Sequence, residues 1–154
     1  MTKEQIMTIA VTPHLNFHGN ARQALEFYQA VFEGELVLTT YADVGAPKDT
    51  PIADTIMWGQ VTTASGFRLM AYDVPTTEQL PALQTVTSRA HGLTLTQASF
   101  FISLRGQQVN EVMELWAKLA EQATIIEPIT QTPWSQLFGM LTDRFGITWV
   151  VDVV

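Results

Sequence analysis

One pattern occurs twice in this sequence, and it restricts the possible folds more than any other feature. Residues 24–28 (ALEFY) align with residues 112–116 (VMELW), 88 positions later, and the type of each residue repeats although the identity is weak. Each copy follows a strand-like run and a glycine-containing break, and each precedes further runs that favour β-structure. The sequence therefore predicts two β-α-β-β-β modules, each too small to bury its own sheet alone.

The first module is expected to begin with a strand and a helix. Residues 9–17 (IAVTPHLNF) alternate apolar and polar side chains, which predicts a strand with one apolar face. Asn20 and Gln23 have the spacing of a capping box, so a helix should begin there and use Gly34 as its C-cap. Its apolar positions follow the helical repeat: Ala24, Leu25, Tyr28, Val31 and Phe32. Three further strands are expected at residues 35–44, 54–63 and 66–74.

The second module is expected to close the chain with a hairpin. A strand at residues 98–105 and a helix at residues 109–123 come first, and apolar runs follow at residues 123–129 and 136–141. The sequence TDRFG then supplies a turn before the last strand, because Gly146 can take a positive φ. In residues 147–154, Trp149 shares a face with other large apolar side chains, which predicts a core position.

The stretch between the modules, residues 75–97, is rich in Thr and Gln and is interrupted by prolines and a glycine. It is expected to be a linker, with either a helical turn near Glu78 to Leu83 or a Thr-rich edge strand at Leu93 to Thr96. The whole chain, residues 1–154, is therefore predicted to form one domain, with module one at about 6–74 and module two at about 98–154.

The predicted fold class is α+β. Two tandem β-α-β-β-β modules would share a curved eight-stranded mixed sheet, with the helices outside and a cleft within. A ferredoxin-like fold is the alternative that we considered. It would need the order β-α-β-β-α-β and lacks the two extra strands of each repeat.

Composition excludes several classes of protein. Hydrophobic residues make up 47% and charged residues 15% of the chain, so a sizeable core is expected. The net charge is −7 and the 8 Lys and Arg residues are scattered, which argues against nucleic acid as a partner. No apolar run approaches the roughly 20 residues of a membrane span, so no membrane partner is expected. The N-terminal residues show no signal-peptide pattern, which predicts a cytoplasmic protein. With no cysteine, disulfides and thiolate chemistry are ruled out.

Three segments carry a resemblance to a known family. They are HLNFHGNARQALEFYQAVF (residues 14–32), FISLRGQQVNEVMELWAKLAEQA (residues 101–123) and PWSQLFGMLTDRFGITW (residues 133–149). Together they resemble the PhnB-like branch of the vicinal oxygen chelate superfamily, to which the glyoxalase and bleomycin-resistance folds belong. The resemblance covers essentially the whole chain and implies the architecture described above.

The resemblance also implies where a metal would bind. Metal-dependent members place His or Glu at four positions, on the first and last strands of each module, so that a divalent ion can hold two substrate oxygens. The matching positions here are Thr12 or Pro13, Leu69 or Met70, Ser99 or Phe101, and Val150. None of these is a usual ligand. We therefore expect no metal site and no cofactor.

Five residues are the candidates for contacting a small molecule. On the first strand, the apolar neighbours of His14 and Asn16 should face the helix, which sends these two side chains toward the predicted cleft. Trp58, Phe101 and Trp134 are expected as its walls, with Trp58 standing where PhnB-like sequences often have His. The alternative interpretations are a histidine held by a backbone carbonyl and aromatic rings that serve packing alone.

The predicted function is accordingly a metal-free protein of unassigned activity that binds a partly aromatic small molecule in an apolar cleft. The alternative is a metal-dependent enzyme, a glyoxalase-type lyase or isomerase or a ring-cleaving dioxygenase, that uses ligands outside the usual set, such as His14. A homodimer is also expected, because relatives often pair and because exposed sheet edges benefit from cover.

Overall fold

The computed structural model describes residues 8–78 and 86–154. The chain divides into two compact units, Met1–Thr77 and Glu78–Val154. Unit one contains β1 (His14–Phe17), α1 (Ala21–Phe32), β2 (Glu35–Thr40), the short 3-10 helix η1 (Ala42–Val44), β3 (Ile56–Thr62) and β4 (Arg68–Asp73). Unit two contains β5 (Thr87–Ala90), β6 (Leu93–Thr96), β7 (Ile102–Gly106), α2 (Val109–Leu119), β8 (Thr124–Thr132), β9 (Ser135–Thr142) and β10 (Thr148–Val153).

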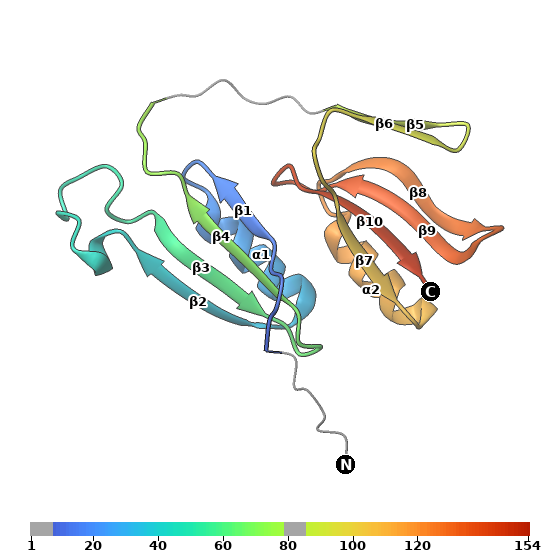
Figure 1. Cartoon of the computed structure of the whole chain (residues 1–154), viewed down its shortest axis with the longest axis horizontal. Helices are drawn as coiled ribbons and strands as arrows, with labels where there is room; N and C mark the ends of the chain where they lie inside the picture. The colour runs from blue at the N-terminus through green and yellow to red at the C-terminus, as the bar shows by residue number, and fades with distance from the viewer. Residues whose placement is uncertain (1–7, 79–85) are drawn as a thin grey trace, which may run out of the picture. The chain divides into compact units, whose positions relative to one another are not determined.

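Each unit contains one four-stranded mixed sheet with the same kind of strand order (Figure 1). Sheet one has the order β1-β4-β3-β2, and sheet two has the order β7-β10-β9-β8. In both, the first strand runs parallel to its neighbour and the other pairs are antiparallel. The predicted α+β class and the two β-α-β-β-β modules are therefore confirmed, with the eight predicted strands lying in two sheets of four.

Helix α1 covers one face of sheet one because its apolar stripe points there. All five apolar positions predicted from the helical repeat are buried. Gly59 of β3 lies beneath the helix, and a Cβ added to it would meet the side chain of Leu25. Burying such a stripe supplies most of the stability of a short helix in a protein.

The start of α1 is stabilised differently from the prediction. The Asn20 side chain makes no capping hydrogen bond. Asp73, at the far end of β4, instead accepts hydrogen bonds from the backbone N–H groups of Gly19 (2.7 Å) and Ala21 (3.0 Å). A carboxylate at this position satisfies orphan donors and complements the helix dipole.

The end of α1 also differs from the prediction. Glu33 takes the left-handed conformation (φ 51°), and the predicted C-cap Gly34 does not. Glycine is needed at position 34 for space, because an added Cβ would lie 2.6 Å from the carbonyl oxygen of Thr62. Gly34 does follow the helix as expected, but it is required for lack of space and not for a left-handed conformation.

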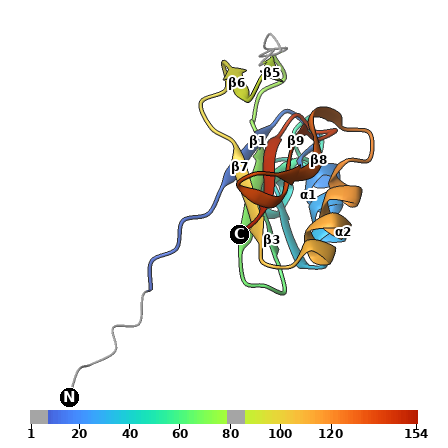
Figure 2. The same ribbon diagram turned by 90° about the vertical axis from the view of Figure 1, so that its right-hand side faces the viewer.

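In unit two, α2 lies against one face of sheet two (Figure 2). Val112, Trp116 and Leu119 are its buried residues. Trp149 of β10 is 1% exposed, so its predicted core position is correct. The closing hairpin also forms as predicted, with β9 and β10 joined by a turn in which Gly146 has φ 87°.

Several boundaries predicted from periodicity are wrong. The strand predicted at residues 35–44 ends at Thr40, and the helix predicted at residues 109–123 ends at Leu119. The first strand begins at His14 and not at Ile9, because its pairing with β4 begins with His14 and Met70. The strand after the linker begins at Ile102 and not at Ala98. Alternation marks the residues that can form a strand, but the length of the partner decides where pairing stops.

The predicted linker contains an antiparallel hairpin, β5–β6. The alternative strand at Leu93 to Thr96 is thus present, although it pairs with β5 in a separate two-stranded sheet. Of the helical turn expected at Glu78 to Leu83, residues 79–83 lie outside the described residues. Across residues 8–78 and 86–154, no helix has the length and hydropathy needed to cross a membrane.

Candidate functional site

Each four-stranded sheet has one face that its helix covers and one face that it does not. In β1, Leu15 and Phe17 are buried while His14 and Asn16 are exposed. In β10, Trp149 and the valines on its face are buried, and the alternate positions are half-buried. Because successive strand residues point to opposite faces, side chains at the second set of positions form what we call the open face of each sheet.

The open face of sheet one gathers aromatic and polar side chains. Asn16 pairs with Tyr72 across β1 and β4, and His14 pairs with Met70. On β3, Gln60 pairs with Met70 of β4, so both lie on the same face. Trp58 is two residues before Gln60 and therefore lies on this face as well. An amide, a phenol, an imidazole and an indole therefore share one face of three neighbouring strands.

The side chains on this face contact one another. His14 Nδ1 lies 3.1 Å from Asn16 Oδ1. The rings of His14 and Tyr72 meet edge to face with centroids 5.2 Å apart. Such contacts restrict the rotamers of the imidazole and the phenol before any ligand arrives, which reduces the entropy lost on binding.

Tyr41 lies beside the end of β4, next to this face. Its hydroxyl donates a hydrogen bond to the backbone carbonyl of Asp73 (2.7 Å). Burial raises the pKa of Tyr41, and electrostatic interactions with Tyr72 and Asp73 raise it further. The phenol is therefore protonated at neutral pH and acts as a hydrogen-bond donor.

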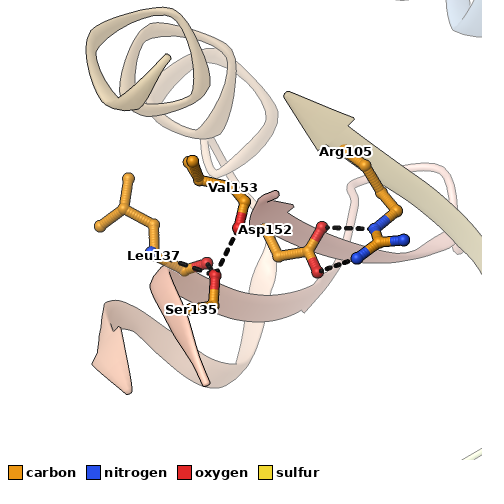
Figure 3. Close-up of polar contacts among 5 residues, drawn as sticks. All are labelled: Arg105, Ser135, Leu137, Asp152 and Val153. Carbon is orange, nitrogen blue, oxygen red and sulfur yellow. Dashed lines mark hydrogen bonds and ion pairs between the residues drawn. The ribbon is translucent and has the colours of Figure 1, made fainter. Parts of the chain in front are cut away.

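The open face of sheet two has an ion pair at its edge. Arg105 of β7 and Asp152 of β10 are paired in register and meet through two hydrogen bonds, of 3.0 and 3.3 Å (Figure 3). Nearby, the Ser135 hydroxyl lies 2.7 Å from the carbonyl oxygen of Val153 and ties the start of β9 to the end of β10. The carboxylate of Asp152 is thus already engaged by the guanidinium, which leaves it a poor ligand for a metal ion.

The other part of this face is aromatic. Phe138 of β9 pairs with Asp152, and its ring meets Trp134 edge to face at 5.8 Å. The guanidinium carbon of Arg89 lies 4.8 Å from the centre of the Phe138 ring, a cation–π contact. Trp134 is 64% exposed at the turn between β8 and β9.

The structure places the five predicted site residues in two groups. His14, Asn16 and Trp58 share the open face of sheet one. Phe101 is half-buried one residue before β7, and Trp134 is at the β8–β9 turn; both belong to unit two. Tyr72 and Phe138 were not predicted, although strict alternation along β4 and β9 would have assigned both to these faces.

The residues that line either open face do not suit a divalent metal. Within residues 8–78 and 86–154, there is no group of three or more His, Asp or Glu side chains placed to hold an ion. On sheet one the imidazole of His14 has Asn16 and Tyr72 as neighbours, and the paired residue on β4 is Met70. A catalytic metal in proteins usually has three such ligands, so the donor set does not fit.

Comparisons with known proteins give a consistent result. The sequence model of the Glyoxalase/Bleomycin resistance protein/Dioxygenase superfamily matches residues 13–151. The Escherichia coli protein YjdN is 24% identical over 94% of this chain and 95% of its own length. The crystal structure of PA1353 from Pseudomonas aeruginosa is 29% identical, with a TM-score of 0.69 over 95% of this chain and 98% of that one. The Bacillus cereus PhnB protein is 23% identical and shares the fold, with a TM-score of 0.70 over 94% and 98% of the two chains.

Proposed function

The chain belongs to the Glyoxalase/Bleomycin resistance protein/Dioxygenase superfamily, and from that membership we propose that it binds a small, partly aromatic molecule without a metal ion. The observation that supports this proposal is the open face of sheet one, where Trp58, Tyr72, His14 and Asn16 lie together. Sites for small molecules combine aromatic walls with a few fixed polar groups, and this face has both.

Each side chain has a distinct role in the proposed site. The indole of Trp58 offers a flat apolar surface for stacking, because ring pairs prefer offset or edge-to-face contact. The Asn16 amide can donate and accept hydrogen bonds, and its contact with His14 restricts it. The protonated hydroxyl of Tyr41 is already donated to the Asp73 carbonyl, so it supports the face and is not offered to the ligand.

Phe101 and Trp134 remain proposed contacts. The Trp134 ring is 64% exposed and is held at one edge by Phe138. A large aromatic side chain fixed by a neighbour but open to solvent is suited to contact a flat ligand at low cost in conformational entropy. These two residues are tested separately from those of sheet one, since they belong to unit two.

A binding titration tests the proposal. Anilinonaphthalenesulfonate serves as a fluorescent probe, and a panel of phenols, aromatic acids and heteroaromatic amides competes with it. We expect at least one compound class to displace the probe, and we expect Trp58→Ala to weaken that binding by about tenfold because a stacked ring contributes roughly 1 kcal/mol or more.

Val44→Ala is the matched control, because Val44 is an exposed apolar residue of unit one on η1, outside the open face. It should bind as the wild type does. If Trp58→Ala and Val44→Ala bind every compound equally well, the open face of sheet one is not the site. Trp134→Ala and Phe101→Ala then show whether unit two carries the binding instead.

One observation favours the alternative of a metal-dependent enzyme. His14 is an exposed imidazole on a strand, and imidazole is a common metal ligand. The discriminating measurement is elemental analysis of tag-free protein that has never met a chelator. About one Zn, Ni, Mn or Fe per chain, lost in His14→Ala, would support the lyase or dioxygenase proposal and contradict the metal-free one.

We further propose that the chain pairs with a second copy and that its two modules act as one domain. The superfamily relationship motivates the pairing, and so do the sheet edges that a single chain leaves open. Sedimentation analysis at micromolar concentration is the measurement. A monomer at every concentration would contradict the pairing and leave the proposed binding function untouched.

A further inference from the structure

The β5–β6 hairpin has one face that the rest of its unit covers and one that it leaves exposed. We call the latter the outer face; it consists of Ser88, Ala90, Leu93 and Leu95, which the strand register places in two facing pairs. Leu93 and Leu95 are 68% and 70% exposed. Just beyond the hairpin on either side, Val86 and Phe100 are 71% and 61% exposed.

The inner face of the hairpin is polar and is anchored to unit two. Its residues are Thr87, Arg89, Thr94 and Thr96. Arg89 forms an ion pair with Glu127 of β8 (3.7 Å), stacks on Phe138 and donates a hydrogen bond to Thr94 (2.7 Å). The Arg89 side chain is only 12% exposed. These contacts fix which face of the hairpin is turned outward.

The usual polarity of a surface hairpin is therefore reversed. A sheet with one solvated face normally turns its apolar residues inward and its polar residues outward. Here threonines and an arginine are turned inward, and the leucines are turned outward. In addition, β5 and β6 form a sheet of two strands with no third strand among the described residues, and such a hairpin is marginally stable alone in water. Both features indicate that the outer face is covered by another surface.

The distribution of charge in the sequence indicates what covers the outer face of the hairpin. Residues 79–110 contain no Asp or Glu, whereas the chain as a whole has 15 acidic residues. The acid-free stretch carries Arg89 and Arg105, so the remainder of the chain has a net charge of −9 against −7 overall. Two copies of so acidic a chain repel one another over most of their surfaces. They can approach with least repulsion through the hairpin, which is also where the exposed leucines are.

We propose that the outer face of the β5–β6 hairpin packs against the same face of a second copy, as the core of a two-fold interface. This inference rests on the pairing proposed above and names the element responsible. A two-fold contact brings a patch against itself, so Leu93 and Leu95 of each copy meet apolar residues of the other. The interface then has an apolar centre free of carboxylates, as the cores of protein interfaces commonly do.

The first test introduces negative charges into the interface. The double variant Leu93→Glu/Leu95→Glu places like charges on both sides of the two-fold contact. We expect the wild type to sediment as a dimer and this variant to dissociate at least about 100-fold more readily. The matched control is Ile9→Glu/Val11→Glu, because these residues are 86% and 96% exposed and lie far from the hairpin in the sequence. The control should remain a dimer.

The folded state of the variants is checked by circular dichroism and thermal unfolding, and Leu93→Thr/Leu95→Thr provides a milder version that keeps β-propensity. A wild-type monomer would contradict both the pairing and the role of the hairpin. A wild-type dimer that survives both hairpin variants would contradict the role of the hairpin alone.

The second test uses the absence of cysteine from this chain. Single cysteines at Ala90, Leu93 and Leu95 are treated with a flexible bis-maleimide reagent, and Val11→Cys is the control. A covalent dimer should form from at least one hairpin variant and not from Val11→Cys. If none of the three hairpin cysteines crosslinks, or if Val11→Cys crosslinks equally well, the outer faces do not meet.

Discussion

The two units share a strand order, but among the described residues each buries one carboxylate, and the two carboxylates are at opposite ends of equivalent strands. In unit one, Asp73 is at the end of β4 and is 2% exposed. In unit two, Asp143 is in the turn before β10 and is 4% exposed. The residue at the end of β10 is Val153, and the residue before the β3–β4 turn is Thr63. Each sheet therefore has a buried carboxylate at one end, and the other unit has a different residue, Val153 or Thr63, at the matching position.

The partners of the two carboxylates differ as well. Asp73 accepts hydrogen bonds from Gly19, Ala21 and Ile56, three residues of distant segments. Asp143 accepts them from the backbone N–H groups of Phe145 and Ile147 and from the indole of Trp149, all within six residues. Asp73 therefore organises long-range packing in unit one, and Asp143 organises a local turn in unit two.

The largest expected effect comes from Asp73→Ala. It would leave three backbone N–H groups from two segments, the start of α1 and the start of β3, without their acceptor, and we expect a loss of about 3–5 kcal/mol in the free energy of unfolding. Urea denaturation measures it. Asp54→Ala is the control, because Asp54 is an exposed aspartate of the same unit, and it should change stability little. Equal effects of the two substitutions would show that Asp73 has no special role.

Asp143→Ala should cost somewhat less, about 2–4 kcal/mol, because two of its three partners are in the turn itself and can reach water when it opens. Asp143→Thr introduces the residue that unit one has before its own turn, and it should recover part of the loss. The chemical shift of the Trp149 indole N–H in an NMR spectrum reports the loss of this hydrogen bond. A Thr variant less stable than the Ala variant would show that the two turns are not interchangeable.

A third comparison concerns the glycines beneath the two helices. A Cβ at Gly139 would lie 2.9 Å from the Ile129 Cα and from the Trp116 ring, whereas at Gly59 it would meet the end of the Leu25 side chain. Because backbone yields less than a side chain, we expect Gly139→Ala to cost about 2–3 kcal/mol and Gly59→Ala about 1–2 kcal/mol. Thermal unfolding of both variants decides the order. The reverse order would mean that Leu25 is held more rigidly than β8.

The smallest effect is expected at a loop that unit two lacks. Unit one joins β2 to β3 through residues 41–55, whereas Pro133 and Trp134 alone join β8 to β9. In the longer loop, the backbone N–H of Thr40 donates to Asp43 (2.9 Å), and this hydrogen bond, followed by that with the Thr40 side chain, lowers the pKa of Asp43. A carboxyl with a lowered folded pKa stabilises the protein above its unfolded pKa.

The pH dependence follows from this sign. The stabilising contribution of Asp43 should be complete above about pH 4, near the pKa of an unfolded aspartate, and should be lost as the pH falls through the lower folded pKa. Wild type and Asp43→Asn should therefore differ slightly in stability at pH 6 and converge in strong acid. The measurement is denaturant unfolding across that range. A difference that grows in acid would contradict the assignment.

Some of these features could be predicted from local sequence. The buried stripe of α1, the core position of Trp149 and the closing hairpin follow from periodicity and from one turn signal, since they depend on neighbours within a few residues. His14 and Asn16 were assigned to the uncovered face of β1 in the same way. Tyr72 of β4 was not predicted, although the same alternation assigns it to the face that contains Asn16.

Other features depend on residues far apart in the chain. Nothing near Ala21 indicates that its N–H is bonded to Asp73, 52 residues later. The local capping signal at Asn20 was misleading, because a distant carboxylate can replace a local cap once the strands have assembled. The reversed polarity of the β5–β6 hairpin was equally hidden, since the inner face is defined only by contact with Glu127 and Phe138.

The sequence by itself determined the α+β class, the two modules and the face to which most strand residues belong, because these follow from periods of 2 and 3.6 residues. Only the tertiary structure decided how each helix begins, where β1 and β7 start, which aromatic rings meet, and which face of the hairpin is left outward. These depend on which strands become neighbours, and a contact between residues dozens of positions apart leaves no periodic trace in the chain.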